Sequence, residues 1–463
     1  MSGQYPLSAE ENFNSIIQRY EQYISGDNTG YFDVEELEII ADYYLQKGRT
    51  KESSKAIDLG LKLHPASTVL QYKRARIYLA MGEKEKALKI IESNTLGNDF
   101  ESKILHGEIL VRLNRFTEAD TIFEQLLHDE QDDKENICLD IAYFYLSVHA
   151  LEKCLKYLQL GLSENENNID LLFELAFCYE QMTETNKCIE TYNRIIDLDP
   201  YSSEAWFNLG QVHFSLENYQ KATEAYEFAT IINESDSGAW LQKAHALFQA
   251  EKYELAIEAY LTYSHLTTHK SIVMIFIGEC YEKMEEYNNA ILYYRQALEE
   301  DAENIDAWMG LVICYLEKEE YETSIETAQK ALAIDDESAE LWVYLAEGYV
   351  NLNKLNEAVD AYRHSLEIQP TQQDTYSSMG SLLLELGNYE GAKEAYLKSY
   401  EQNKDTENIT LLLAITYCKL QQIDWTLHFL EKALIENQNA LSALLEVCPE
   451  AEPVIKDELN KRL

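Results

Sequence analysis

The chain has 463 residues, of which 46% are hydrophobic and 26% are charged, and 82 Asp and Glu against 38 Lys and Arg give a formal net charge of −44. This hydrophobic content is enough to build a folded core, so the composition excludes a disordered chain. A strongly acidic surface repels phosphate backbones and anionic lipids, so we expect neither nucleic acid nor a membrane among the partners.

The first residues, MSGQYPLSAEENF, contain neither a basic segment nor an apolar run of the kind found in secretory signals. The longest apolar runs, such as IVMIFI at 272–277, are far too short to cross a bilayer. The eight Cys stand singly, without the CxxC pair typical of a redox motif or a zinc site. We therefore expect a cytoplasmic protein without a metal site or a cofactor.

Three parts are predicted in chain order. Residues 1–33 form an N-terminal capping segment with one amphipathic helix, and Asp33 together with Glu36 indicates the start of the next helix. Residues 34–440 hold twelve repeats. Residues 441–463 form a second, C-terminal capping segment of helical character that covers the last repeat.

The middle part repeats itself every 34 residues. A shift of that length places Trp206 on Trp240, and Trp308 on Trp342. Such a period is typical of solenoids, in which one helical hairpin is stacked on the next. The repeats begin at residues 34, 68, 100, 135, 169, 203, 237, 271, 305, 339, 373 and 407.

Two positions in each repeat carry small side chains. The eighth residue is Gly or Ala in eleven of the twelve repeats, and the twentieth is Ala, Ser, Cys or Thr in all twelve. Apolar residues recur around them at steps of three and four, which predicts two amphipathic helices per repeat. Because a small side chain lets two helix axes approach closely, we expect these two positions to be the helix–helix contacts.

The order Trp-x2-Leu-Gly-x2-Tyr, followed by Ala-x3-aromatic, resembles the tetratricopeptide repeat family and in particular its long bacterial-type arrays. The resemblance covers residues 34–440 and implies an all-α solenoid, a right-handed superhelix of about twelve helix-turn-helix repeats. It also implies that the first helix of each repeat lines a concave groove. The matching residues of one repeat are Trp206, Leu209, Gly210, Ala222 and Tyr226, with His213 at the Tyr position.

The fifth, ninth and twelfth residues of the first helices are the candidates for lining this groove. Aromatic side chains gather there with a few polar groups, a combination that suits an extended peptide or a helix. Large residues at helical spacing also serve as core, so packing alone is the alternative for each of them. The candidate binding residues are Tyr72, Arg76, Tyr143, Phe173, Phe177, Phe207, Gln211, Phe214, Leu241, His245 and Phe248.

The carboxylate clamp that the family uses to hold peptide C-termini is absent from the sequence. Phe173, Phe207 and Leu241 stand where that site needs Lys, and Asn208 alone carries no charge to hold a carboxylate. This argues against an adaptor for chaperone tails.

One segment, residues 47–115, is basic, with 14 Lys and Arg against 8 Asp and Glu. Within it Lys73, Arg76 and Arg112 are candidates for holding an acidic peptide, with scattered surface charge as the alternative. The basic segment also allows salt-sensitive self-association with an acidic flank of a second molecule.

The sequence contains no GxSxG elbow, no HExxH, no phosphate-binding GxxxxGK and no dinucleotide glycine pattern. By analogy with the fold, we expect a non-enzymatic scaffold that binds a peptide segment or a partner protein in the concave groove. The alternative is a regulatory protein whose superhelix closes on a small molecule or a signalling peptide.

Overall fold

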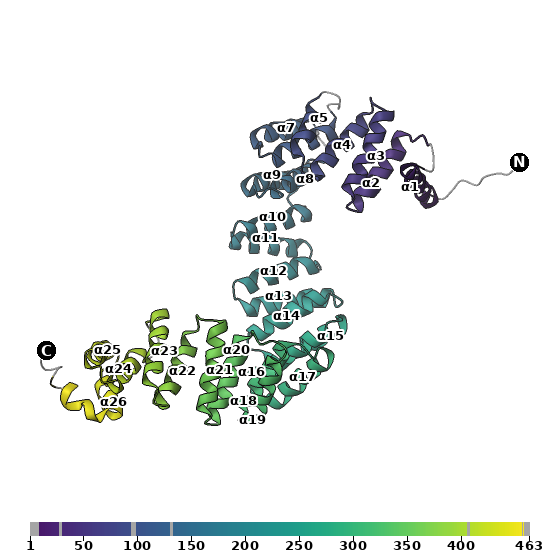
Figure 1. The fold of residues 1–463 in the computed structure, drawn as a ribbon. Helices are drawn as coiled ribbons and strands as arrows, with labels where there is room; N and C mark the ends of the chain where they lie inside the picture. Colours follow the sequence, from purple (N-terminus) through teal and green to yellow (C-terminus); the bar gives the residue numbers. More distant parts are fainter. Residues whose placement is uncertain are drawn as a thin grey trace. The chain divides into compact units, whose positions relative to one another are not determined.

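The computed structural model describes residues 9–26, 30–93, 99–129, 133–404, 408–455 and 457. Within these residues the regular structure is helical and contains no strand. The chain divides into two compact units, Met1–Val212 and His213–Leu463. Figure 1 labels helices of both units.

The first unit begins with one helix and continues as helical pairs. The boundary between the two units, after Val212, falls inside the last helix of this unit, α12. The helices are α1 (Ala9–Ser25), α2 (Val34–Gln46), α3 (Thr50–Leu63), α4 (Thr68–Ala80), α5 (Lys84–Glu92), α6 (Phe100–Arg112), α7 (Phe116–Asp129), α8 (Lys134–Leu146), α9 (Leu151–Glu164), α10 (Ile169–Gln181), α11 (Thr185–Leu198) and α12 (Ser203–Ser215).

The second unit continues the same alternation and ends in a short helix and a 3₁₀ turn. Its helices are α13 (Tyr219–Ile232), α14 (Ser237–Gln249), α15 (Tyr253–Leu266), α16 (Lys270–Lys283), α17 (Tyr287–Glu300), α18 (Ile305–Glu317), α19 (Tyr321–Leu332), α20 (Ala339–Asn351), α21 (Leu355–Ile368), α22 (Gln373–Glu385), α23 (Tyr389–Gln402), α24 (Ile409–Lys419), α25 (Ile423–Glu436), α26 (Ala440–Val447) and η1 (Pro449–Ala451).

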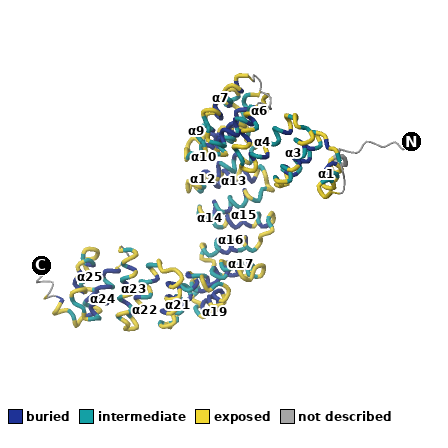
Figure 2. Tube along the Cα trace, turned by 45° about the horizontal axis from the view of Figure 1, so that its top comes forward, coloured by how far each residue is buried: buried dark blue, intermediate teal, exposed yellow. Residues whose placement is uncertain are grey.

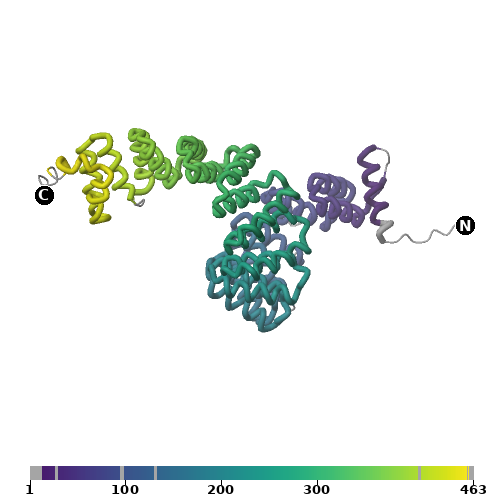
Figure 3. The backbone as a smooth tube through the Cα atoms, turned by 90° about the horizontal axis from the view of Figure 1, so that it is seen from below, coloured from purple at the N-terminus to yellow at the C-terminus, as the bar shows by residue number. Residues whose placement is uncertain are grey.

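The helices α2 to α25 form twelve pairs, and each first helix begins within two residues of a repeat start predicted from the sequence. Figure 3 follows the chain through these successive hairpins. The prediction of an all-α solenoid of about twelve tandem helical pairs is therefore confirmed. The predicted capping box is also present, because Glu36 N–H donates to Asp33 Oδ1 at 2.8 Å and Asp33 N–H donates to Glu36 Oε2 at 3.2 Å.

The turn inside each pair depends on one left-handed residue, the fifteenth of the repeat. Gly48, Gly82 and Gly387 have φ of 69°, 78° and 77° there, a conformation that costs glycine nothing. The other nine repeats place a residue with a side chain in the same conformation, among them Thr183 at φ 58°. A positive φ is unfavourable for a β-branched residue, so the hairpin packing must hold this turn in place.

The small eighth and twentieth residues lie where the helices touch. Ala222 and Ala256, both twentieth residues, are fully buried. A methyl group added to Gly107, an eighth residue, would come within 2.1 Å of the Phe123 ring. Figure 2 shows buried residues recurring from helix to helix in both units. The predicted reason for the small residues, close approach of neighbouring helices, is thus what the packing shows.

Tryptophan at the fourth position of a repeat ties the helix to the turn before it. The Trp308 Nε1–H donates to the carbonyl oxygen of Ala302 at 2.9 Å, and Trp342 donates to that of Asp336 at 3.0 Å. Ala302 and Asp336 stand where the family pattern has proline. Because the acceptor is a backbone carbonyl, which every residue has, the hydrogen bond forms without proline at this turn.

The two ends of the array bury apolar side chains of their own. In α1, Ile16, Ile17 and Tyr20 are buried in one cluster with Leu37 and Ile40 of α2. At the other end, the buried residues of α26 and the following turn, Leu444, Cys448 and Ile455, join the cluster of the last repeats. That these two ends act as caps remains a prediction.

Candidate functional site

The predicted binding residues lie on the surface formed by the first helices of successive repeats, called here the first-helix face. In each unit a cavity lies on this face. The cavity of the first unit lies along α2, α4 and α6, and that of the second along α14, α16 and α18.

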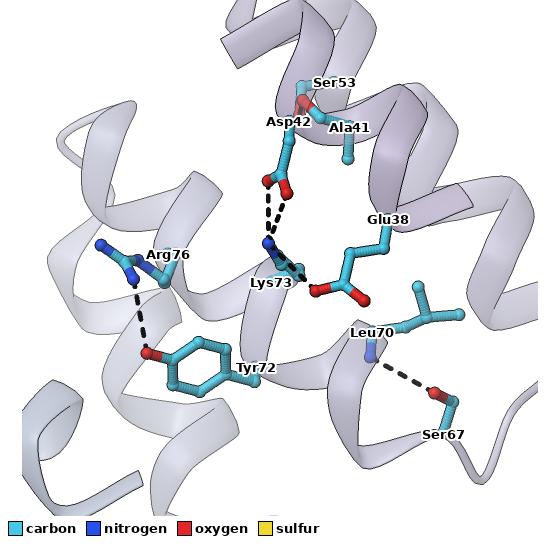
Figure 4. Close-up of polar contacts among 9 residues, drawn as sticks. All are labelled: Glu38, Ala41, Asp42, Ser53, Ser67, Leu70, Tyr72, Lys73 and Arg76. Carbon is cyan, nitrogen blue, oxygen red and sulfur yellow. Dashed lines mark hydrogen bonds and ion pairs between the residues drawn. The ribbon is translucent and has the colours of Figure 1, made fainter. Parts of the chain in front are cut away.

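The cavity of the first unit has a volume of about 430 Å³ and contains two of the predicted residues, Tyr72 and Arg76. Arg76 Nη1 lies 3.4 Å from the Tyr72 hydroxyl oxygen, to which it donates (Figure 4). Phe100 and Ile104 of α6 line the opposite side. The structure thus brings an aromatic ring and a cation together with apolar walls, and peptide binding by these two residues stays a prediction.

Lys73 lies in the same cavity, but its charge is already matched inside the fold (Figure 4). Its Nζ lies 2.8 and 2.7 Å from the two carboxylate oxygens of Asp42 and 3.1 Å from Glu38 Oε1. Burial by itself lowers the pKa of Lys73, but these hydrogen bonds outweigh burial and raise the pKa. Arg112 is likewise paired, 2.9 Å from Glu108. An acidic peptide would have to displace these carboxylates, so the alternative of scattered surface charge describes Lys73 and Arg112 better.

Two further predicted residues of the first unit, Tyr143 and Phe177, expose 44% and 40% of their surface. The Tyr143 hydroxyl donates to Glu174 Oε1 at 2.9 Å, and burial together with this carboxylate raises the pKa of Tyr143 to about 12. Both side chains therefore remain accessible on α8 and α10.

The remaining predicted residues of the first unit differ in exposure. Phe173 is half-buried, with its ring centroid 6.3 Å from that of Tyr192 in an edge-on contact. Phe207 is half-buried and Gln211 is exposed. Phe173 therefore serves partly as core, which was the alternative for each aromatic residue.

In the second unit, three predicted residues are engaged mainly in packing. His245 Nδ1 lies 2.8 Å from the Tyr260 hydroxyl, and its ring centroid lies 5.0 Å from that of Phe276. Burial lowers the pKa of His245. Leu241 packs against the buried cluster of α14–α16, and Phe214 makes an edge-on contact with the Tyr219 ring at 5.4 Å. These three residues therefore contribute mainly to packing beneath the first-helix face, and less to its binding surface.

Phe248 lines the cavity of the second unit, which has a volume of about 280 Å³. Met309 and Ile313 of α18 add apolar walls, and Glu279 and Glu282 of α16 add carboxyl groups. Glu279 is the ninth and Met309 the fifth residue of its repeat, so the same positional rule that selects Phe177 and Phe173 also finds them. Ile313, another ninth residue, and Glu282, a twelfth, also follow from that rule, whereas Asp306, a second residue that also lines the cavity, lies outside it.

Burial raises the pKa of two carboxyl groups in this cavity, those of Glu279 and Glu282. Burial, with Glu282 and Asp306 nearby, raises the pKa of Glu279 to about 7. Burial also raises the pKa of Glu282, against a 2.8 Å hydrogen bond from the Tyr294 hydroxyl that lowers it. Near neutral pH a large share of Glu279 is therefore protonated, so this wall can donate a hydrogen bond as well as accept one.

The structure thus joins Tyr72 to Arg76 in one cavity and places Phe248 in another, while the rest of the predicted set is spread along the first-helix face. Among the described residues, no three His, Cys, Asp or Glu side chains are grouped as a metal ion would require. In the same part of the chain, no helix has both the length and the apolar composition to cross a membrane.

Comparisons with known families match repeats along much of the chain. Tetratricopeptide repeat models match residues 170–202, 283–329, 339–372 and 373–406. The model described as anaphase-promoting complex, cyclosome, subunit 3 matches residues 189–263. No curated protein matches the sequence.

Several solved structures are similar to this chain at low identity. The Cut9–Hcn1 hetero-tetramer of the APC/C is 16% identical over 89% of this chain and 96% of that chain, with a TM-score of 0.37. A repeat-containing protein of Cytophaga hutchinsonii is 17% identical over 51% and 98%, with a TM-score of 0.44. A tetratricopeptide repeat protein of Parabacteroides merdae is 17% identical over 54% and 98%, with a TM-score of 0.42.

The family matches fall on the helical pairs described above, and they agree with the small contact residues and the tryptophan-tied turns of those pairs. The chain therefore contains tetratricopeptide repeats, at the matched residues 170–202, 283–329 and 339–406.

Proposed function

We propose that the protein is a non-enzymatic scaffold that binds an extended segment of a partner protein on its first-helix face. Proteins with these repeats generally act as protein–protein interaction scaffolds. This supports the class of function, but it does not identify the binding site. The observation that supports the site is the cavity at Phe248, where three successive first helices, α14, α16 and α18, contribute to one space.

The chemistry of this cavity suits an apolar anchor next to a polar backbone. Phe248, Met309 and Ile313 offer apolar contact, and burying one apolar side chain there is worth about 1.5–3 kcal/mol. Glu279, with its raised pKa, can exchange hydrogen bonds with a peptide amide without placing a full charge beside the anchor. The partner segment therefore presents a large apolar side chain in an extended stretch.

The test is a selection from a random peptide display library against the whole protein, followed by affinity measurement of the selected peptides. Phe248→Ala removes the anchor contact and should weaken binding by about tenfold or more. Met309→Ala, on the opposite wall, should act in the same direction. Leu255→Ala is the matched control, because Leu255 is 49% exposed on α15 and does not line this cavity.

Melting curves of all three variants separate loss of binding from loss of folding. If selected peptides bind Phe248→Ala and Met309→Ala as tightly as the original protein, the cavity is not the recognition site. Peptides enriched in large apolar residues that bind the control variant normally would support it.

A further inference from the structure

A second kind of surface cavity lies between the second helices of neighbouring repeats, on a different face from the proposed peptide site. One of these, called here the Trp342 groove, has a volume of about 500 Å³ between α19 and α21, and α20 forms its floor. Trp342 and Tyr349 are half-buried in that floor, and Leu345 is buried between them. Glu357 and Asp360 of α21 stand exposed at the rim.

The same unit contains a matched groove three repeats earlier. The Trp240 groove lies between α13 and α15 with a volume of about 360 Å³, and its floor comes from α14. Trp240 is the counterpart of Trp342 and Lys243 is the counterpart of Leu345, each 102 residues earlier. The two grooves can therefore be compared position by position.

In the Trp240 groove a cation of the chain itself lies over the aromatic ring. Lys243 Nζ lies 5.0 Å from the centroid of the Trp240 ring and 3.9 Å from Glu227 Oε1. Its side chain is only 15% exposed. A cation held over an indole ring beside a carboxylate is a favourable arrangement, and the fold uses it here internally.

The repeat directly before the Trp342 groove also supplies its own cation. Arg295 Nη2 donates to the Tyr315 hydroxyl at 2.6 Å. Tyr315 is the counterpart of Tyr349, and Arg295 is the counterpart of Gln329, each one repeat earlier. At two equivalent places in this unit a Lys or an Arg of the chain itself thus contacts an aromatic side chain, Trp240 or Tyr315.

In the Trp342 groove neutral residues occupy both of these positions. Leu345 replaces the lysine, and Gln329 replaces the arginine and donates to the Tyr349 hydroxyl at 3.1 Å. The aromatic floor is retained and fixed, because the Trp342 indole N–H donates to the Asp336 carbonyl and the His364 ring lies 4.6 Å from the indole.

The lining of the Trp342 groove has two carboxylates and no Lys or Arg, whereas that of the Trp240 groove has three Glu together with Lys243 and Lys252. Glu357 stands where the Trp240 groove has Leu255, and no ion pair joins Glu357 within the part of the chain that the structure describes. Asp360 forms an exposed ion pair with Arg363, whose Nη1 lies 2.8 Å from Asp360 Oδ1. A competing cation can replace Arg363 in this pair at little cost in free energy. Residues 213–463 hold 45 Asp and Glu against 18 Lys and Arg, so the surroundings also favour a cation.

We propose that the Trp342 groove binds a basic segment of a partner protein, with one Arg or Lys side chain lying against Trp342 and Tyr349 and pairing with Glu357 and Asp360. The partner side chain takes the place that Lys243 takes in the Trp240 groove and that Arg295 takes beside Tyr315. Arginine suits the groove best, because its planar guanidinium stacks on aromatic rings and pairs with carboxylates at the same time. This surface is separate from the Phe248 cavity, so either site can exist without the other.

The test uses the whole protein and a defined probe, a fluorescein-labelled, C-terminally amidated peptide Gly-Ser-Arg-Leu-Arg-Ser-Gly. Its counterpart carries citrulline, a neutral group of the same shape, in place of both arginines. Fluorescence anisotropy at low salt should show saturable binding of the arginine peptide and about tenfold weaker binding of the citrulline peptide. Hydrogen exchange should place the protection in α19–α21.

Three variants of the protein and one control variant complete the test. Leu345→Lys restores the internal cation and should reduce binding about tenfold, as should Glu357→Gln combined with Asp360→Asn. The reciprocal change, Lys243→Leu, empties the Trp240 groove and should add a second site for the same peptide. Glu326→Gln is the matched control, because Glu326 is the counterpart of Asp360 one repeat earlier and lies outside the groove.

Equal binding of the arginine and citrulline peptides, or binding unchanged by Leu345→Lys and by the double neutral variant, would overturn the proposal. So would self-association of the protein that disappears in the double variant, because a second copy would then be the occupant. Phe248→Ala should leave this binding intact, so failure here is distinguishable from failure of the proposed function.

Discussion

The ring of Tyr294 lies directly against the backbone of Gly278, where a methyl group would come within 2.6 Å of the ring carbon Cε1. Gly278 is the eighth residue of its repeat, and Tyr294 lies in the second helix of the same pair. The pairing recurs three repeats later between Gly380 and Tyr396, at 2.8 Å. The small eighth residue therefore makes room for an aromatic ring from the partner helix, and this contact holds the hairpin together.

Gly278→Ala should destabilise this hairpin although Ala is the better helix former by about 1 kcal/mol. The added methyl overlaps the Tyr294 ring, which is buried and also packs against Gly310, so we expect a net loss of about 1–2 kcal/mol. Long repeat arrays need not unfold in one step, so hydrogen exchange in α16 and α17 is the local measurement.

Gly238→Ala is the control for that change. A methyl group there meets only Asp236 Oδ1 at 3.2 Å, at the exposed start of α14. It should leave exchange unchanged or slow it. Faster exchange in the control than in Gly278→Ala would contradict the packing described for the eighth residue.

Asp120 should make a large contribution to the stability of the first unit. Both the Tyr145 and the Tyr157 hydroxyls donate to its Oδ1, at 2.7 and 2.8 Å, and Lys153 Nζ lies 2.5 Å from Oδ2. Asp120→Ala leaves two buried hydroxyls without an acceptor and should cost about 2–4 kcal/mol. Glu124→Gln, which removes only an exposed ion pair with Lys156, should cost less than about 1 kcal/mol.

The same carboxylate predicts a pH dependence. Burial raises the pKa of Asp120, but the hydrogen bonds from Lys153, Tyr145 and Tyr157 outweigh burial and lower it. A folded pKa below the unfolded one gives stability that is present above the unfolded pKa, and this stability is lost as the pH falls through the folded pKa. The difference in melting temperature between the original protein and Asp120→Ala should therefore shrink in acid. A difference that stays constant down to strongly acidic pH would mean that the carboxylate charge does not matter.

Glu279 should have the opposite pH dependence. Its folded pKa, raised to about 7 chiefly by burial, lies above that of an unfolded glutamate, so folding favours its protonated form. This contribution is fully present below the unfolded pKa, and it is lost as the pH rises through the folded pKa. Glu279→Gln should therefore stabilise the second unit at pH values above about 7, by roughly 1–3 kcal/mol, and change little in mild acid. A variant that melts no later than the original protein at alkaline pH would contradict the buried position of Glu279.

The parts of this fold that depend on local periodicity follow from the sequence. The helix starts and the small contact positions repeat every 34 residues, so one register explains them all. The capping pair Asp33 and Glu36 also follows, because it joins residues of one turn. The left-handed fifteenth residue does not follow, since Thr183 or Glu217 in that place carries none of the signal that Gly48 gives.

The site could be predicted only in part, because residues at one repeat position meet different neighbours. His245 and Phe177 are both ninth residues, but Tyr260 and Phe276 hold the first inside the fold while the second stays 40% exposed. Lys73 was a candidate for holding an acidic peptide, but the carboxylate of Asp42, in the preceding repeat, already pairs with its charge. Such pairings between repeats depend on three-dimensional contact that periodicity does not specify.

The most direct test of the repeat register enlarges one of the small contact residues. Ala256 is a fully buried twentieth residue in α15, whereas Ala80, at the end of α4, is exposed. Thermal melting of Ala256→Leu should show a loss of about 1–3 kcal/mol from crowding, and Ala80→Leu should melt like the original protein. If Ala256→Leu melts at the temperature of the original protein, the close helix contact at this position does not exist, and the stacking described here is wrong.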